Sequence, residues 1–426
     1  MLEESEDRQD IVERVAALDI GKATLVCCTR VPNPDKPGRR MQEVTTHRTM
    51  TRDLGRLAAR LYELGVTRVV MEATSDYWKP VFYLLEAAGF ETWLVNAHDV
   101  KHLPGRPKTD RIDAVWLCKL AERQMLRPSF VPPVEIRRLR DPTRYRVDLV
   151  ITQSSEKNRV EKLLEDAQIK LSVVASDIFG VSGRAMMAAL IAGERDPMTL
   201  AQLARATLRR KLDDLQEALT GRFDQHHAFL LAKMLGRIDA IQTDIDDVDA
   251  QIEVHIAPFA HTAARLEQIP GIGRVAARAI IAEIGVDMTR FPTAAHLSSW
   301  ARFSPKVKES AGRTKGTSAT GHGNPYLSRT LGHVAASAGR TQTFLGERFR
   351  RIRRRRGPQR AIVAVGRSAL VILWHLLSNP EATYQDLGVT FYDTRINPER
   401  RARHHIRQLQ ALGFDVTATR ALPTAA

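Results

Sequence analysis

The first 145 residues constrain the fold most strongly, because short apolar segments of strand length alternate there with segments of helical period. Residues 15–28 contain two strand patterns separated by a turn at Gly21, which predicts a hairpin. Three more strand patterns and two helical patterns follow, at residues 41–50, 54–64, 66–74, 80–88 and 91–96. This order predicts an α/β domain with a central mixed sheet.

Four acidic residues stand near the ends of these segments. Asp19 lies near the end of the first predicted strand, and Glu72 lies at the carboxyl end of the strand at residues 66–74. Asp110 and Asp113 are three residues apart at the predicted start of a helix, so their carboxylates project from one helix face. Acids that complement the helix dipole are the simpler interpretation of that pair alone. Sites on α/β sheets, however, collect at the carboxyl ends of strands, where all four acids would converge.

Four carboxylates without matching cations are costly to bring together, since each charge opposes the ionisation of the others. Divalent cations offset that cost, and Mg²⁺ prefers oxygen ligands of this kind. Two such ions about 4 Å apart are a common arrangement for phosphodiester chemistry. We therefore expect a Mg²⁺ site formed by Asp19, Glu72, Asp110 and Asp113.

Length and charge limit the class of protein. A chain of 426 residues is too long for one core, so two or three domains are expected. Its 64 lysines and arginines exceed its 49 acids and give a net charge of +15, which favours a polyanionic partner, most simply nucleic acid. A polar amino terminus and the lack of an apolar run of about 18 residues predict a cytoplasmic location.

A heptad pattern marks the middle of the chain. Apolar residues recur there with spacings of three and four residues, at Leu231, Met234, Ile238, Ile241, Ile245, Val248 and Ile252. The pattern predicts a coiled coil, and the alternative is a helix packed antiparallel on residues 147–171 of the same chain. We expect both, namely an intrachain helical hairpin that also mediates self-association, with a helical insertion at residues 172–223 between its arms.

Two later segments suggest contact with a nucleic-acid backbone. Pro270-Gly-Ile-Gly273 between two helical patterns is typical of a helix-hairpin-helix, whose second helix offers backbone N–H groups to a phosphate. Residues 348–356 contain seven arginines in nine positions. A purely structural turn and a solvated basic helix are the respective alternatives.

The segment from Phe303 to Leu327 is rich in glycine, serine and threonine and carries several lysines and arginines. It is too long for a simple connection between helices, which favours a functional loop. Ser310 lies within it, but the sequence assigns it no histidine or aspartate companion, so the loop alone does not identify a nucleophile.

Together these motifs resemble those of a known family. The acids occur in the order Asp-Glu-Asp-Asp, within Leu-Asp-Ile-Gly-Lys, Met-Glu-Ala-Thr and Lys-Thr-Asp-x-x-Asp, as in the RNase H-like (RuvC-like) domain of the IS110 insertion-sequence transposases. The later loop is similar to the family's serine segment, since Ser310 stands five residues after Pro305 and Gly323-Asn324 follows. Ala311 replaces a usual glycine, and Gly321 replaces a frequent lysine.

The resemblance covers about residues 10–380 and implies a role for each motif. It implies a DNA transposase in which Ser310, rather than the competing Ser304, attacks a phosphodiester and forms a phosphoserine link. It further implies a guide RNA and a composite site shared between the subunits of a dimer or tetramer. The residues expected to contact nucleic acid are Gly271, Gly273, Arg313, Lys315, Asn324, Arg329, Arg351, Arg353 and Arg354.

We accordingly expect a multidomain chain of α/β and all-α parts. The predicted parts are an RNase H-like catalytic domain (1–145), a coiled-coil hairpin (146–258), a helical transposase domain (259–390) and a basic tail (391–426). One alternative is a Mg²⁺-dependent junction nuclease in which water attacks. A second is a binding protein without catalysis.

The charge of the chain yields a first prediction. A net charge of +15 offers more phosphate contacts than a compact active site needs. Protein purified together with the non-coding DNA that flanks its gene should therefore carry one discrete RNA, detectable by sequencing the RNA that copurifies. Recovery of only random cellular RNA would remove the main support for an RNA-guided reaction.

Overall fold

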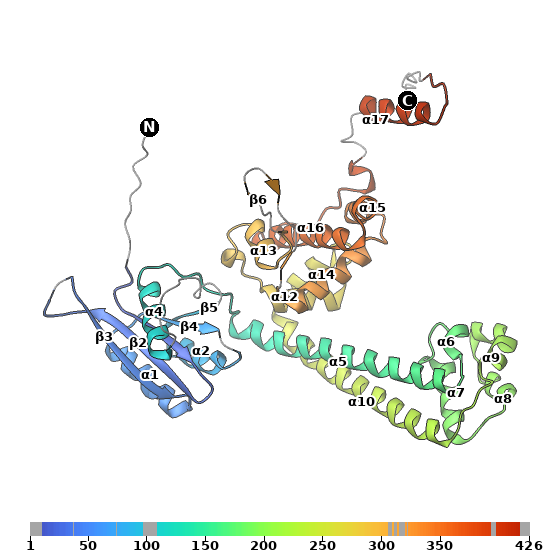
Figure 1. Cartoon of the computed structure of the whole chain (residues 1–426), viewed down its shortest axis with the longest axis horizontal. Coiled ribbons are helices and arrows are strands. Elements are labelled where there is room, and N and C mark those ends of the chain that lie inside the picture. The colour runs from blue at the N-terminus through green and yellow to red at the C-terminus, as the bar shows by residue number, and fades with distance from the viewer. Residues whose placement is uncertain are drawn as a thin grey trace. The chain divides into compact units, whose positions relative to one another are not determined.

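The computed structural model describes residues 11–36, 38–73, 75–96, 109–305, 309–310, 313–314, 320–321, 323–392 and 398–417 (Figure 1). The chain divides into two compact units, Met1–Val131 and Pro132–Ala426. Lys315 and the other residues outside these ranges are not described.

The first unit is built on a five-stranded mixed sheet. Its strands are β1 (Val15–Ile20), β2 (Thr24–Pro32), β3 (Arg40–Arg48), β4 (Arg68–Ala73) and β5 (Glu91–Asn96), in the order β3-β2-β1-β4-β5. β1, β2 and β3 pair antiparallel, whereas β1 with β4 and β4 with β5 pair parallel. The predicted mixed α/β sheet is confirmed, and its order is consistent with an RNase H-like domain.

Helices cover both faces of this sheet. One face carries Leu18, Met71 and Leu94, which pack against the buried residues of α1 (Thr51–Glu63) and α2 (Trp78–Ala87). The other face carries Ala17 and Val70, which pack against α4 (Asp110–Glu122). Successive residues of a strand face opposite sides of the sheet. Because helices cover both sides, nearly every residue of β1 is buried.

Two long helices open the second unit. α5 (Val134–Asp166) and α10 (Gln225–Ile256) run side by side along much of their length (Figure 1). Ile241 and Ile245 contact Leu149 of α5, and five of the seven heptad residues are buried within the chain. The heptad seam is therefore occupied by α5 of the same chain, and its role in self-association stays a prediction.

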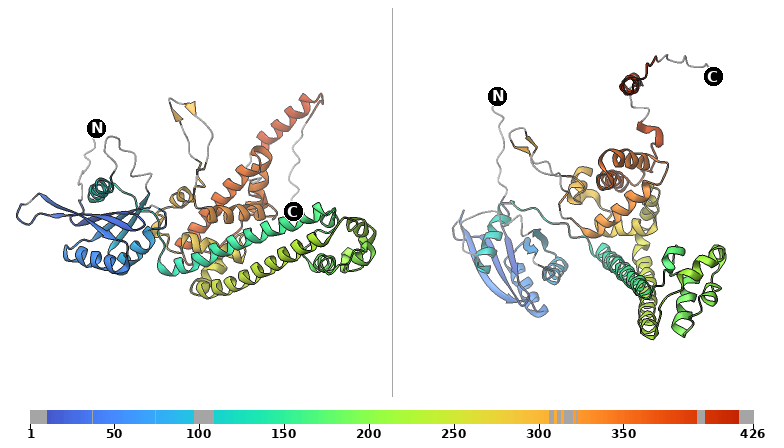
Figure 2. Two further views of the ribbon diagram at one scale, coloured as in Figure 1. Left: turned by 60° about the horizontal axis from the view of Figure 1, so that its bottom comes forward. Right: turned by 45° about the vertical axis from the view of Figure 1, so that its right-hand side comes forward.

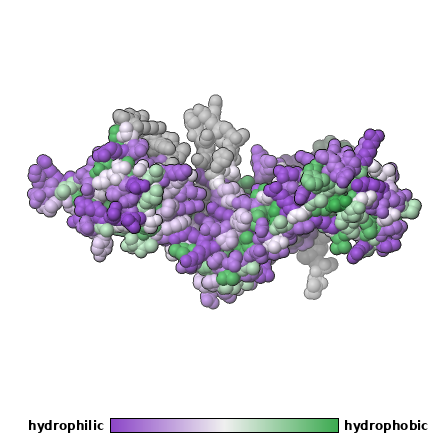
Figure 3. Space-filling model, turned by 90° about the horizontal axis from the view of Figure 1, so that it is seen from below, coloured by the Kyte–Doolittle hydropathy of each residue, from purple (hydrophilic) through white to green (hydrophobic). Residues whose placement is uncertain are grey.

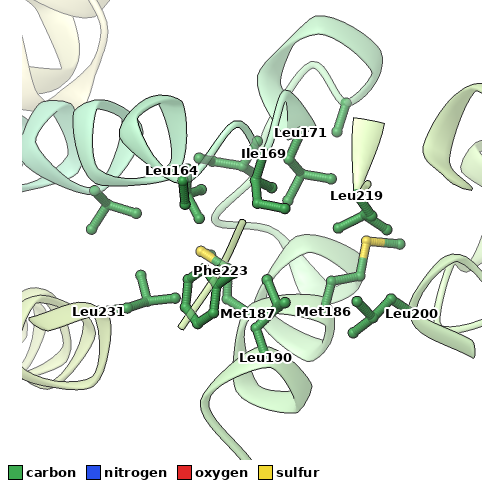
Figure 4. Close-up of a cluster of buried hydrophobic side chains, with 14 of the residues drawn as sticks. Leu164, Ile169, Leu171, Met186, Met187, Leu190, Leu200, Leu219, Phe223 and Leu231 are labelled. Atoms are coloured by element: carbon green, nitrogen blue, oxygen red, sulfur yellow. The ribbon is translucent and has the colours of Figure 1, made fainter. Parts of the chain in front are cut away.

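The segment between the two long helices forms a small helical module with its own core. It contains α6 (Leu171–Val174), α7 (Val181–Ala192), α8 (Pro197–Ala201), η1 (Ala206–Lys211) and α9 (Leu212–Ala218). Met186, Met187 and Leu190 of α7 meet Leu164 of α5 and Leu231 of α10 in this core (Figure 4). The hydrophobic contacts close the far end of the hairpin.

Shorter elements complete the second unit. They are η2 (Ala257–Phe259), α11 (Ala260–Glu267), α12 (Arg274–Ile284), η3 (Met288–Arg290), α13 (Ala294–Trp300), β6 (Glu309–Ser310), β7 (Arg313–Thr314), α14 (Pro325–Ala338), α15 (Phe344–Arg356), α16 (Pro358–Ser378), η4 (Val389–Tyr392) and α17 (Pro398–Ala411). α16 has the length and mean hydropathy of a membrane span. It packs, however, against α11, α13, α14 and α15, as the central helix of a bundle does.

The turn between α11 and α12 requires glycine at one position only. Gly271 has a φ of +91°, and a Cβ there would lie 2.4 Å from the carbonyl oxygen of Val334 in α14. Gly273 is the N-cap of α12 with a φ of −100°, and a Cβ there would meet nothing within 4 Å. Packing against α14 therefore requires a glycine at position 271, whereas position 273 has room for a side chain.

This difference can be measured in stability. Gly271→Ala should lower the free energy of unfolding by about 3 kcal/mol or more, because the side chain meets backbone atoms in a left-handed conformation. Gly273→Ala should lower it by less than about 1 kcal/mol. Chemical denaturation of both variants, followed by circular dichroism, tests the contrast. Equal losses would contradict this account of the turn.

Candidate functional site

Two of the predicted acids are neighbours in the sheet of the first unit. β1 and β4 are parallel, and Leu18 pairs with Met71. Asp19 and Glu72 follow one residue later, so they stand side by side at the carboxyl ends of their strands. Because side chains alternate, both belong to the sheet face that α4 covers.

α4 brings the other two acids to the same edge. Thr109 caps this helix by accepting a hydrogen bond from the backbone N–H of Ile112, so Asp110 and Asp113 fall in its first turn. Further along α4, Cys118 donates to the carbonyl oxygen of Val15 over 3.7 Å, at the opposite end of β1 from Asp19. The start of α4 is thereby directed toward the carboxyl end of β1.

The electrostatics of Asp19 indicate that the other three acids lie close to it. The pKa of Asp19 is raised from 3.8 to about 6, first by burial and then by the negative charges of Asp110, Glu72 and Asp113, in that order. A hydrogen bond from the backbone of Ile20 acts in the opposite direction. The sheet and α4 thus bring three further carboxylates near enough to Asp19 to oppose its ionisation.

The donor set of this cluster fits Mg²⁺. All four donors are carboxylates, which are the ligands that hard divalent cations prefer, and a cation among them would offset their repulsion. Within the described ranges, no group of three or more histidine, cysteine, aspartate and glutamate side chains already has the spacing of a metal site. The fit therefore rests on charge and ligand type.

The predicted serine lies in a small hairpin of the second unit. Ser310 of β6 pairs with Arg313 of β7 (Figure 2). The two ends of the surrounding loop meet at its base, where a Cβ on Gly323 would lie 2.8 Å from Cγ of Arg302. Ser304, the competing residue, is half-buried near this base.

Three of the residues predicted to contact nucleic acid line one cavity. Gly271, Gly273 and Arg329 border a space of about 450 Å³ between α5, α12 and α14. The rim also carries Arg146 and Arg274, each of which is paired with an acid of α10. This surface offers both the open start of α12 and positive charge.

The arginine-rich segment forms α15, and its side chains have different surroundings. The guanidinium of Arg351 lies 4.8 Å from the ring centre of Tyr392, whose hydroxyl accepts a hydrogen bond from Arg348 over 2.9 Å. Arg353 and Arg354 are exposed. Arg353 and Arg354 are therefore better placed than Arg351 to contact a phosphate.

The structure gives Asn324 a contact that the sequence did not indicate. Its side-chain oxygen caps α14, and its amide donates to Glu283 of α12, which is buried. Glu283 also pairs with Arg140 and Arg144 of α5. A lone acid in the apolar run Ala279-Ile-Ile-Ala-Glu-Ile284 was the only sequence signal for this cluster.

An acidic cluster on an α/β sheet, followed by a basic helical unit, defines a protein that acts on nucleic acid. Two family models match the chain, one described as a transposase of the DEDD type of IS110 over residues 16–169, and one as a transposase of the IS116/IS110/IS902 family over residues 263–350. The chain belongs to the IS110 family of transposases, and it is a DNA transposase.

Two relatives are similar to the chain. The transposase for insertion sequence element IS1111A of Coxiella burnetii is 25% identical over 328 residues, which are 76% of this chain and 80% of that protein. An uncharacterized protein of insertion element IS110 from Streptomyces coelicolor is 26% identical over 200 residues, which are 44% of this chain and 45% of that protein.

The raised pKa of Asp19 has a measurable consequence for stability. Between about pH 4 and 6 the unfolded chain releases the Asp19 proton while the folded chain retains it, so the folded state loses stability as the pH rises. In metal-free protein, Asp19→Asn should therefore raise the thermal midpoint by a few degrees at pH 8 and by less at pH 4.

Magnesium provides the complementary measurement. Mg²⁺ should raise the midpoint of the wild-type protein at pH 8 and should have a much smaller effect on the Asp19→Asn protein, since one ligand is lost. Equal responses of the two proteins to Mg²⁺ would show that Asp19 is not a ligand of the ion.

Proposed function

We propose that this transposase cuts and rejoins DNA with Ser310 as the nucleophile and with Mg²⁺ held by Asp19, Glu72, Asp110 and Asp113. The observation that carries the proposal is the placement of these carboxylates, by the parallel register of β1 with β4 and by the first turn of α4, and the raised pKa of Asp19 supports it. The position of Ser310 in a hairpin whose loop closes at its base supports the second half of the proposal.

The proposed reaction conserves the number of phosphodiester bonds. The hydroxyl of Ser310 loses its proton and forms a bond to phosphorus, while the bond from phosphorus to a sugar oxygen breaks and that oxygen gains a proton, so the net proton count is unchanged. The hydroxyl end of another strand then attacks the phosphoserine and releases the serine. Rejoining by this route needs no external energy source, because each step exchanges one phosphate ester for another.

The acids of the first unit would support that exchange. Asp19 and Glu72 would hold a cation from the strand ends, and Asp110 and Asp113 would hold it from the start of α4. When bound, Mg²⁺ would polarise the scissile phosphate and stabilise the leaving oxygen.

The second unit would bind the nucleic acids. Hydrophilic side chains cover most of the face shown in Figure 3, and the chain carries a net charge of +15. Contacts with phosphates would come from the cavity at Gly273 and Arg329 and from the exposed Arg353 and Arg354. We include among the ligands a guide RNA encoded by the element, as well as the DNA of the element ends and the target.

Self-association and a location in the bacterial cytoplasm, on the nucleoid, complete the proposal. Because α5 occupies the heptad seam of α10, a dimer or tetramer formed through this hairpin would use its outward surfaces. Tyr145 and Phe229 are large exposed side chains of α5 and α10 that such a contact could cover.

Replacement of the serine separates transfer to the protein from hydrolysis. Ser310→Ala should abolish both cleavage and joining, because no other group can form the covalent link, whereas Ser304→Ala should retain most of both. Wild-type protein stalled on a nicked substrate should carry a DNA end that survives denaturation, visible as a band of lower mobility in a denaturing gel.

Each outcome of this experiment assigns the nucleophile. Absence of the covalent band from Ser310→Ala, with its presence in Ser304→Ala, supports the proposal. If the Ser310→Ala protein cleaves DNA at the rate of the wild type, water is the nucleophile and the enzyme is a nuclease.

A further inference from the structure

A single buried carboxylate ties the serine-bearing loop to three helices of the second unit. The side chain of Glu283, at the end of α12, is only 2% exposed. Arg144 of α5 binds it with two hydrogen bonds of 2.7 Å, from Nε to Oε1 and from Nη2 to Oε2. Such paired contacts fix both distance and orientation, so Glu283 holds α5 and α12 in one arrangement.

Arg140, one helical turn earlier in α5, completes the charge balance. Its Nε lies 3.5 Å from Oε2 of Glu283 and donates to the carbonyl oxygen of Ala282 over 2.8 Å. Its Nη2 donates to the carbonyl oxygen of Glu283 over 2.7 Å. Two arginines therefore surround one acid, and one of them also caps the last turn of α12.

Asn324 connects this cluster to the loop. Its amide nitrogen donates to Oε2 of Glu283. Its oxygen accepts from the backbone N–H groups of Tyr326 and Leu327 over 3.0 and 3.2 Å, which caps α14. Asn324 is thus the residue at which the loop ends, and both groups of its side chain are engaged.

The other limb of the loop is fixed as well. Phe303 is buried, and a Cβ on Gly366 of α16 would lie 2.5 Å from its ring. Arg302 before it has a left-handed φ of 62°, and Gly323 packs against its side chain. The base of the loop is therefore closed by one apolar anchor and one polar anchor.

We propose that Glu283 is a positioning residue for the transfer reaction. Through Asn324 it sets where the loop that carries Ser310 leaves the helical bundle, and through Arg144 it couples that point to the long helix α5. The inference rests on the proposed role of Ser310, because Glu283 would act through the loop that carries this serine.

The polarity of the contact suggests a sharp test. Asn324→Asp keeps an oxygen that can cap α14, but it replaces the donor to Glu283 with a second carboxylate, which repels the first. Glu283→Gln leaves Arg140 and Arg144 without a buried acid. The double variant Glu283→Gln with Asn324→Asp restores the hydrogen bond between these two side chains in the opposite direction and restores the charge of the cluster. It gives up the hydrogen bond from Nη2 of Arg144 to Oε2 and keeps the one from Nε to Oε1.

The rate of strand joining should be compared among the wild type, the two single variants and the double variant. At saturating DNA, Asn324→Asp should join strands on the order of tenfold or more slowly, because a displaced nucleophile loses its alignment. The double variant should recover part of that rate, a coupling that independent effects would not give. Saturating DNA keeps a change in affinity from affecting the comparison. Asp196→Ala, which removes the N-cap of α8 in the insertion, serves as a control for general destabilisation and should keep its rate.

A second measurement does not depend on the chemistry of Ser310. Trypsin cuts after lysine and arginine, and the loop offers Lys306, Lys308, Arg313 and Lys315. Cleavage of the native protein within this loop should be faster for Asn324→Asp than for the wild type, and the double variant should reverse the change. This readout also applies if the single variant Glu283→Gln fails to fold.

The outcomes distinguish failure of this inference from failure of the proposed function. Wild-type joining by Asn324→Asp beside an inactive Ser310→Ala protein would overturn the positioning role and leave the serine in place. Cleavage by Ser310→Ala would overturn the proposed function, and the role of Glu283 would then be judged by trypsin alone. A slow Asn324→Asp protein that the double variant does not rescue would also overturn the positioning role.

Discussion

The parallel pairing of β1 with β4 is the constraint on which the candidate site depends. Antiparallel neighbours place the carboxyl ends of their strands at opposite edges of a sheet, whereas this pair brings Asp19 and Glu72 to the same edge. α4 then adds two more acids, and burial together with the charges of its three acidic neighbours raises the pKa of Asp19. The apolar cores on both faces of the sheet offset this unfavourable interaction in the free protein.

In the second unit, the neighbours of a buried acid carry positive rather than negative charge. Glu283 is surrounded by Arg140, Arg144 and the amide of Asn324, so its charge is neutralised within the fold. An acid held by two arginines stabilises one arrangement of helices, whereas Asp19 lies near three other acids, whose negative charges a bound cation would offset. The sign of the neighbouring charges, rather than burial itself, separates Glu283 from Asp19.

Local sequence patterns predicted the elements well but predicted partners poorly. The strands of the first unit follow from apolar periodicity, because that signal lies within a few neighbouring residues. The heptad residues of α10 were correctly seen as a buried seam, yet the same seam serves an intrachain or an intermolecular helix equally well. The contact of Asn324 with nucleic acid stays a prediction, and the structure adds its roles as a helix cap and as a donor to Glu283, which no local pattern indicated.

The sequence by itself determined the acids, their order, the serine segment and the excess of positive charge, since these are properties of residue type and spacing. Only the tertiary structure decided which of them meet. Register sets Asp19 beside Glu72, the packing of α14 explains Gly271, and the approach of α5 to α12 creates the Glu283 cluster. These contacts join residues far apart in the chain, and their energies depend on distance and burial, which no local pattern of residues contains.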